Sequence, residues 1–169
     1  REIDIAEFAP GIVRAARESF PHLNEGILDH PQTHLLLEDG RNVLLTRDRA
    51  YDLITIEVTN VWFAGATNLY SREFFELAKQ RLRPGGVLQQ WVQLHHIGPN
   101  EVASILATMR SVFPHAGLWF YGTQGILVAS ERPLTIDPSR RAGLDERYGS
   151  RGRVDELLNA ALVSPPEMD

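Results

Sequence analysis

The sequence contains no cysteine among its 169 residues. A disulfide framework, a thiolate metal site and a cysteine nucleophile are therefore excluded. The chain also lacks an apolar run of about 20 residues, which a membrane-spanning helix needs, and it lacks the basic-then-apolar start of a secretory signal. We therefore expect this chain to be cytoplasmic and to make no membrane contact of its own.

Positive charge is scarce as well. Lys and Arg number 17 against 22 Asp and Glu, so the formal net charge is -5. This balance argues against a nucleic-acid partner or an anionic lipid surface and favours small-molecule ligands. The hydrophobic share of 43% and the charged share of 23% suit one ordinary globular domain.

Two further absences concern the start of the chain. No G-x-G-x-x-G loop occurs in the sequence. The chain opens with Arg1-Glu2 and enters an apolar alternation almost at once, without a cap or leader. We therefore expect the natural protein to begin further upstream.

Strand-like and helical patterns alternate along most of the chain. The expected strands are residues 3–7, 33–37, 51–58, 87–94, 118–121 and 125–129. The expected helices are residues 12–20, 42–46, 74–82 and 99–113, the third ended by glycine geometry in Arg83-Pro84-Gly85-Gly86. This order predicts an α/β fold with a mostly parallel sheet, helices on both faces and an antiparallel C-terminal strand pair.

The composition changes after residue 134. Proline, arginine and glycine dominate there, and a short amphipathic stretch follows from Val154 to Leu162. We therefore expect residues 1–134 to form the domain and residues 135–169 to be its linker and packing helix.

Acidic residues stand at the ends of three predicted strands: Glu7, Asp39 and Glu57. In open α/β sheets, ligands bind beyond the carboxyl ends of the strands. There Glu7 can accept the hydroxyls of a ribose, Asp39 beside Gly40 can accept from a purine amine, and Glu57 can face a reacting centre. Taken singly, each acid is equally well explained as a solvated loop residue, so the interpretation depends on the set of three.

The histidines do not indicate a metal centre. His30 and His34 are four residues apart, as two ligands on one helix face would be. However, Pro31 and Thr33 between them favour a loop that enters a strand. No metal is expected.

Longer motifs carry a family pattern. They are Tyr51-Asp52-Leu53-Ile54 leading to Glu57-Val58-Thr59-Asn60-Val61-Trp62, the run from Ala64 to Phe75, and Leu82 to Leu88, with Ile5-Ala6-Glu7-Phe8 and Glu38-Asp39-Gly40-Arg41 upstream. Together they resemble the spermidine synthase family, most closely the bacterial branch whose members are often fused to membrane segments. The resemblance runs from about residue 3 to about residue 134.

This resemblance implies a Rossmann-like, methyltransferase-type fold and transfer of an aminopropyl group from decarboxylated S-adenosylmethionine to an amine. It implies no metal and no prosthetic group. Glu7 matches the ribose contact, Asp39 and Gly40 match the adenine contact, and Glu57 matches the base that deprotonates the amine. It also implies a homodimer, and a parent protein anchored to the membrane by an upstream segment.

Four residues are expected to contact the acceptor. Gln90 matches a glutamine of a family strand, Asn60 lies in the acceptor loop, and Trp62 and Tyr70 are expected to form an apolar wall around the amine. For the two aromatic residues, ordinary core packing is the alternative.

The sequence also departs from the family pattern. Asn60 and Val61 replace an aspartate and a proline, and Glu57 replaces an aspartate, so a substrate other than putrescine is expected. The first strand with its glycine-rich loop is missing from the chain, and without it two sheet edges would be unpaired. Two alternatives therefore stay open: a methyltransferase that uses S-adenosylmethionine itself, and a non-catalytic nucleoside-binding or assembly module.

Overall fold

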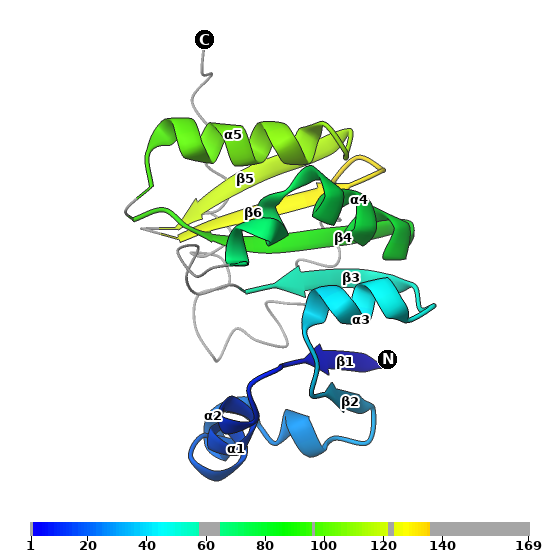
Figure 1. The fold of residues 1–169 in the computed structure, drawn as a ribbon, viewed down its shortest axis with the longest axis vertical. Coiled ribbons are helices and arrows are strands. Elements are labelled where there is room, and N and C mark those ends of the chain that lie inside the picture. Colours follow the sequence, from blue (N-terminus) through cyan, green and yellow to red (C-terminus); the bar gives the residue numbers. More distant parts are fainter. Residues whose placement is uncertain (1, 58–64, 96, 122–123, 136–169) are drawn as a thin grey trace. The chain divides into compact units, whose positions relative to one another are not determined.

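The computed structural model describes residues 2–57, 65–95, 97–121 and 124–135 (Figure 1). Asn60, Trp62 and the predicted C-terminal linker and helix lie outside the described residues, apart from the first residue of the linker. The chain divides into two compact units, Arg1–Arg49 and Ala50–Asp169. Each unit is described by itself below.

The first unit is a two-stranded parallel sheet with its connecting helices. Its elements are β1 (Ile3–Ala6), α1 (Pro10–Glu18), α2 (Pro21–Asn24), the 3-10 helix η1 (Ile27–Asp29), β2 (Thr33–Leu36) and α3 (Gly40–Thr46). The register pairs Ile3 with Thr33 and Ala6 with Leu36, so both strands end at the same level.

Local chemistry explains where these helices begin. Pro10 occupies the first turn of α1, where a missing N–H costs nothing. The loop between α2 and η1 turns through Glu25 and Gly26, both left-handed at φ 53° and 70°. Asp39 caps α3, its side chain accepting from the Asn42 N–H at 3.0 Å.

The second unit contains a four-stranded mixed sheet. Its elements are β3 (Tyr51–Ile56), η2 (Ala66–Tyr70), α4 (Arg72–Arg81), β4 (Leu82–Gln93), α5 (Pro99–Arg110), β5 (His115–Tyr121) and β6 (Gln124–Ser130). The strand order is β3-β4-β6-β5, with β3 parallel to β4 and with β6 antiparallel to both β4 and β5. The predicted parallel arrangement and its antiparallel closing pair are confirmed.

The boundary between α4 and β4 differs from the prediction. Arg83-Pro84-Gly85-Gly86 was expected to end the helix, but α4 ends at Arg81 and β4 begins at Leu82. The glycines instead form an irregular start of the strand, because the β3–β4 register shifts between Tyr51 and Leu53. Gly85 lies there at φ 84°, a left-handed conformation that glycine adopts readily.

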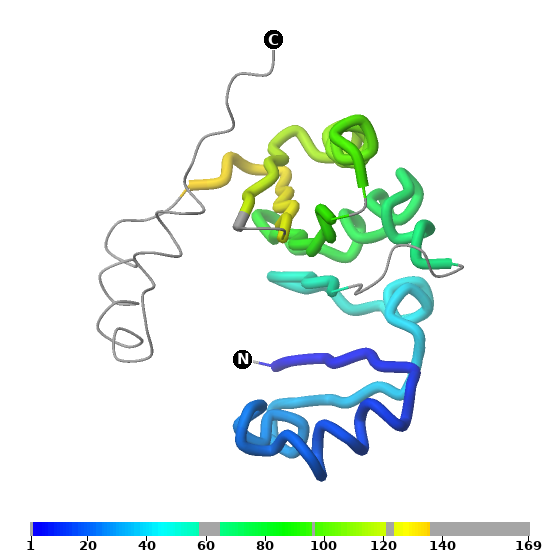
Figure 2. The backbone as a smooth tube through the Cα atoms, turned by 90° about the vertical axis from the view of Figure 1, so that its left-hand side faces the viewer, coloured from blue at the N-terminus to red at the C-terminus, as the bar shows by residue number. Residues whose placement is uncertain are grey.

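The core of the second unit lies between one face of its sheet and the helices. In Figure 2, α4 and α5 lie on the same side of this sheet. The buried apolar side chains are Ile54, Phe74, Phe75, Leu77, Ala78, Leu88, Val92, Met109, Phe113, Leu127 and Ala129. Alternate residues of β4 are buried, as expected for a strand with one face on the core.

Each unit also has a sheet edge that carries no described partner strand. Among the described strands, β1 pairs only with β2, and β3 pairs only with β4. These are the two edges that the sequence predicted to be unpaired without the family's first strand.

Candidate functional site

Glu7 and Asp39 lie at the same end of the two-stranded sheet in the first unit. Glu7 directly follows β1, and Asp39 lies three residues after β2. The neighbouring backbones come close here, since a Cβ placed on Gly40 would lie 3.7 Å from the Cβ of Ala6. Adjacent parallel strands therefore bring Glu7 and Asp39 to one end of the sheet, and their roles as ribose and adenine contacts stay predictions.

Both carboxylates also have structural partners. Glu7 Oε1 accepts from the Ala9 N–H at 2.7 Å, at the entrance of α1, and Asp39 Oδ1 caps α3. The second oxygen of each carboxylate makes no hydrogen bond to any of the described residues. Because the backbone holds one oxygen of each carboxylate, the orientation of the other oxygen is restricted.

Glu57 belongs to the second unit and is exposed. It is the first residue after β3, whose last residue Ile56 pairs with Gln90 on β4. Glu57 therefore stands at the carboxyl end of a parallel strand, where ligand-binding residues of α/β sheets gather. Its convergence with Glu7 and Asp39 on one nucleoside stays a prediction.

The side chains of Tyr70, the last residue of η2, and Gln90, on β4, link these two elements of the second unit. Gln90 is fully buried, and its Nε2 donates to the Leu69 carbonyl at 3.1 Å. The Tyr70 hydroxyl donates to the Trp91 carbonyl at 3.2 Å. Burial raises the pKa of Tyr70, and the nearby Gln90 side chain opposes part of that rise.

The other face of β4 carries polar side chains to which the sequence analysis gave no role. Thr55 donates to Gln89, Trp91 donates to Gln124, and Gln93 contacts His95. Their period of two along the strand was the available signal. The first two contacts join β4 to its neighbouring strands β3 and β6.

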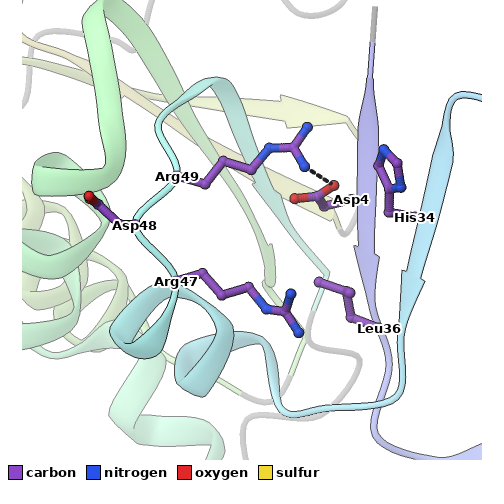
Figure 3. A pocket seen from close by; sticks show the side chains of 6 residues that line it. All are labelled: Asp4, His34, Leu36, Arg47, Asp48 and Arg49. Carbon is purple, nitrogen blue, oxygen red and sulfur yellow. Dashed lines mark ion pairs between the residues drawn. The ribbon is translucent and has the colours of Figure 1, made fainter.

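A cavity of about 440 Å³ opens elsewhere in the first unit, on the sheet face of Asp4 and His34 (Figure 3). The guanidinium of Arg49 reaches Asp4 Oδ1 at 2.9 Å, and Arg47 pairs with Glu38 at 3.3 Å. Since both guanidinium groups are paired with carboxylates, the cavity has little net charge to attract an ion. The predicted site residues do not line it.

Within ranges 2–57, 65–95, 97–121 and 124–135, no three acidic or histidine side chains are placed to hold a metal ion. No helix in that part of the chain has the length and hydropathy needed to span a membrane.

A family model and individual relatives both match this sequence to polyamine-forming transferases. The spermine/spermidine synthase domain matches residues 1–123. Polyamine aminopropyltransferase 2 of Pseudomonas aeruginosa is 35% identical across 71% of this chain and 37% of its own length. A polyamine aminopropyltransferase of Nitrosomonas europaea is 31% identical across 96% of this chain and 53% of its own length. The chain thus spans between a third and just over half of these relatives.

Solved structures show a similar fold. A spermidine synthase in complex with the transition-state analogue AdoDATO aligns with a TM-score of 0.78 at 17% identity, covering 97% of this chain and 58% of the other. Human methyltransferase-like protein 13, in complex with SAH, aligns with a TM-score of 0.65 at 19% identity, covering 99% and 74%. At these identities the likeness establishes the Rossmann-like, methyltransferase-type fold.

Proposed function

Because the chain belongs to the spermine/spermidine synthase family, we propose that its protein transfers an aminopropyl group from decarboxylated S-adenosylmethionine to an amine. The observation that carries this proposal furthest is the placement of Glu7 and Asp39 at the ends of adjacent parallel strands. Each keeps a carboxylate oxygen without a partner among the described residues, which suits acceptance from ribose hydroxyls and from the adenine amine.

The proposed reaction is a direct displacement. Glu57 takes a proton from the acceptor ammonium, and the amine lone pair attacks the carbon beside the sulfonium. A carbon–nitrogen bond forms as the carbon–sulfur bond breaks, and methylthioadenosine leaves with the bonding electron pair. The sulfonium is already a good leaving group, so most of the acceleration comes from alignment of the two reactants.

The acceptor is proposed to differ from a simple diamine. Asn60 stands where polyamine-specific members carry an aspartate, so a carboxylate for a second ammonium is missing. Glu57 is one methylene longer than the usual aspartate, and this moves its carboxylate by about 1 Å. Tyr70 and Trp62 are proposed to provide apolar surface beside the acceptor.

The direct test uses the full-length protein with decarboxylated S-adenosylmethionine and a panel of monoamines, diamines and polyamines. Formation of methylthioadenosine with at least one amine is expected, detected by liquid chromatography. Absence of this product across the panel would overturn the proposal. A second arm with S-adenosylmethionine separates the methyltransferase alternative, whose nucleoside product is S-adenosylhomocysteine.

Glu57→Gln tests the base and the non-catalytic alternative. The exposed side chain makes no hydrogen bond or ion pair with the described residues, so folding should be unchanged. Loss of a general base lowers kcat by about 100- to 10,000-fold, measured as methylthioadenosine release. Glu57→Asp, which restores the carboxylate found in the family, is the matched control and should retain more activity. Unchanged cellular function of Glu57→Gln would favour a non-catalytic module.

The proposal includes a cytoplasmic location for the domain and pairing into a homodimer, as the family resemblance implies. Light scattering of the full-length protein checks the dimer. A monomeric mass at assay concentration would contradict it.

A further inference from the structure

Gln90 is a polar residue in an apolar environment. It is 0% exposed, and the flanking residues on the same face of β4, Leu88 and Val92, are apolar and 0% and 1% exposed. A buried amide loses its hydrogen bonds to water, whereas leucine at this position would lose none. Packing alone therefore does not explain a glutamine here.

The amide takes part in a reciprocal connection between η2 and β4. The Gln90 side chain donates to the backbone of Leu69, and the Tyr70 side chain donates to the backbone of Trp91. Two successive residues of η2 are thus bonded to two successive residues of β4. We call these two hydrogen bonds the Tyr70–Gln90 clasp.

The position of the clasp connects it to the proposed reaction. Gln90 pairs with Ile56, the last residue of β3, and Glu57 follows immediately. The clasp therefore holds η2 and the Tyr70 ring against β4 near the end of β3, where Glu57, the proposed base, follows. The Tyr70 hydroxyl already donates its hydrogen bond to the Trp91 carbonyl. An amine would therefore contact the ring of Tyr70 and not its hydroxyl.

We propose that Gln90 is a positioning residue that shapes the acceptor side of the site through the clasp, without touching the amine itself. This inference rests on the proposed aminopropyl transfer. It gives Gln90 an indirect role in place of the direct contact that the sequence suggested.

The side-chain oxygen of Gln90 bears on whether this residue serves the site or the stability of the fold. Gln90 Oε1 is buried and accepts no hydrogen bond from the described residues. An unsatisfied buried oxygen destabilises the fold, so an apolar residue of the same shape should cost little stability. Gln90 is thus expected to serve the site and not the stability of the unit.

The test compares Gln90→Met, which keeps the shape and removes the amide, with Tyr70→Phe in the full-length protein. Both variants should raise KM for the amine about tenfold and change KM for the nucleoside donor less than about twofold, since the positioning lost lies on the acceptor side. Amide hydrogen exchange of residues 65–71 should accelerate in both. The urea midpoint of Gln90→Met should equal or exceed that of the wild type.

Leu88→Ala is the matched control, because it opens a cavity beside Gln90 and leaves the clasp intact. It should lower the urea midpoint without a selective change in KM for the amine. An unchanged KM for the amine in Gln90→Met, or an equal change in Leu88→Ala, would overturn the inference. If the wild type transfers no aminopropyl group, the proposed function fails separately. Even for a wild type without this activity, the clasp is tested by hydrogen exchange. If residues 65–71 exchange no faster in Gln90→Met than in the wild type, the clasp is rejected.

Discussion

At the scale of single residues, the two carboxylates of the first unit each combine a structural contact with a proposed binding contact. Glu7 holds the Ala9 N–H, and Asp39 holds the Asn42 N–H. Both contacts lie at helix N-termini, where backbone donors would otherwise be unpaired. A carboxylate suits this double task because it has two acceptor oxygens, whereas an amide or hydroxyl side chain has only one oxygen.

Asp39 allows the two contacts to be separated. Asparagine is as good a cap as aspartate, so Asp39→Asn should leave the free energy of unfolding almost unchanged, whereas Asp39→Ala should lose about 1 kcal/mol. In asparagine a single uncharged oxygen would have to serve both the α3 cap and the adenine amine, and the second position holds an NH2 donor. Both variants should therefore bind methylthioadenosine about 10- to 100-fold more weakly, since a hydrogen bond to a charged group contributes about 1.5–3 kcal/mol. Calorimetry and urea unfolding measure the two effects, and full affinity in Asp39→Asn would contradict the adenine contact.

Tyr70 leads to a prediction about alkaline stability. Its pKa is raised above the ordinary 10.0 in the folded protein by burial, so the unfolded chain releases this proton first as the pH rises. The stability that neutral Tyr70 contributes is therefore complete below pH 10.0 and is lost as the pH rises through the folded pKa. Urea unfolding from about pH 9 to 11 should show a smaller loss of stability in Tyr70→Phe than in the wild type. Equal slopes would exclude this linkage.

At the scale of elements, the start of β4 shows how close backbone packing selects residues. The space around Gly86 is small, since a Cβ there would lie 3.0 Å from the Arg83 carbonyl oxygen and 3.1 Å from that of Tyr51. Both neighbours are backbone atoms of the strand pair, so neither can move without disturbing the β3–β4 register. This irregular segment precedes the regular part of β4 that carries Gln90.

Gly86→Ala should therefore destabilise the protein by about 1–3 kcal/mol, the usual effect of overpacking. Gly11 in α1 is the matched control, because nothing lies within 4 Å of a Cβ placed there. Gly11→Ala should change stability by less than about 1 kcal/mol, in the stabilising direction. Urea unfolding of the purified chain measures both, and equal effects would show that β4 tolerates a side chain at position 86.

At the scale of the whole chain, the two units differ in their cores. Among the described residues, the buried apolar side chains of the first unit are Val13, Val43 and Leu44, whereas the second unit buries Phe74, Phe75, Phe113 and many more. The proposed nucleoside contacts Glu7 and Asp39 lie in the unit with the smaller core. Local opening there should cost less free energy, because fewer apolar contacts are broken.

Amide hydrogen exchange should accordingly be faster in β1 and β2 than in β4 and β6. Methylthioadenosine should slow the exchange of β1, β2 and their following turns in the full-length protein, because a ligand stabilises the state that binds it. Mass spectrometry of peptic peptides measures both effects. Equal protection of the two sheets without ligand would contradict this difference in stability.

Much of the fold could be predicted from the sequence, because periodicity and turn residues are local signals. The parallel strands, the antiparallel closing pair and most helices were predicted correctly, and the motif around Glu57 indicated the family. The prediction for Gly85 and Gly86 was wrong, since a glycine pair after a helix can end the helix or form a strand irregularity. Which occurs depends on the neighbouring strand β3.

For the candidate site, the sequence by itself determined which acids stand at strand ends, since these positions follow from apolar runs and their boundaries. Only the tertiary structure decided the burial and the contact of Gln90, whose amide donates to the Leu69 carbonyl. The physical reason is that burial and hydrogen-bond partners of a side chain depend on segments distant in sequence. Gln90 and Leu69 are 21 residues apart, and no local pattern joins them.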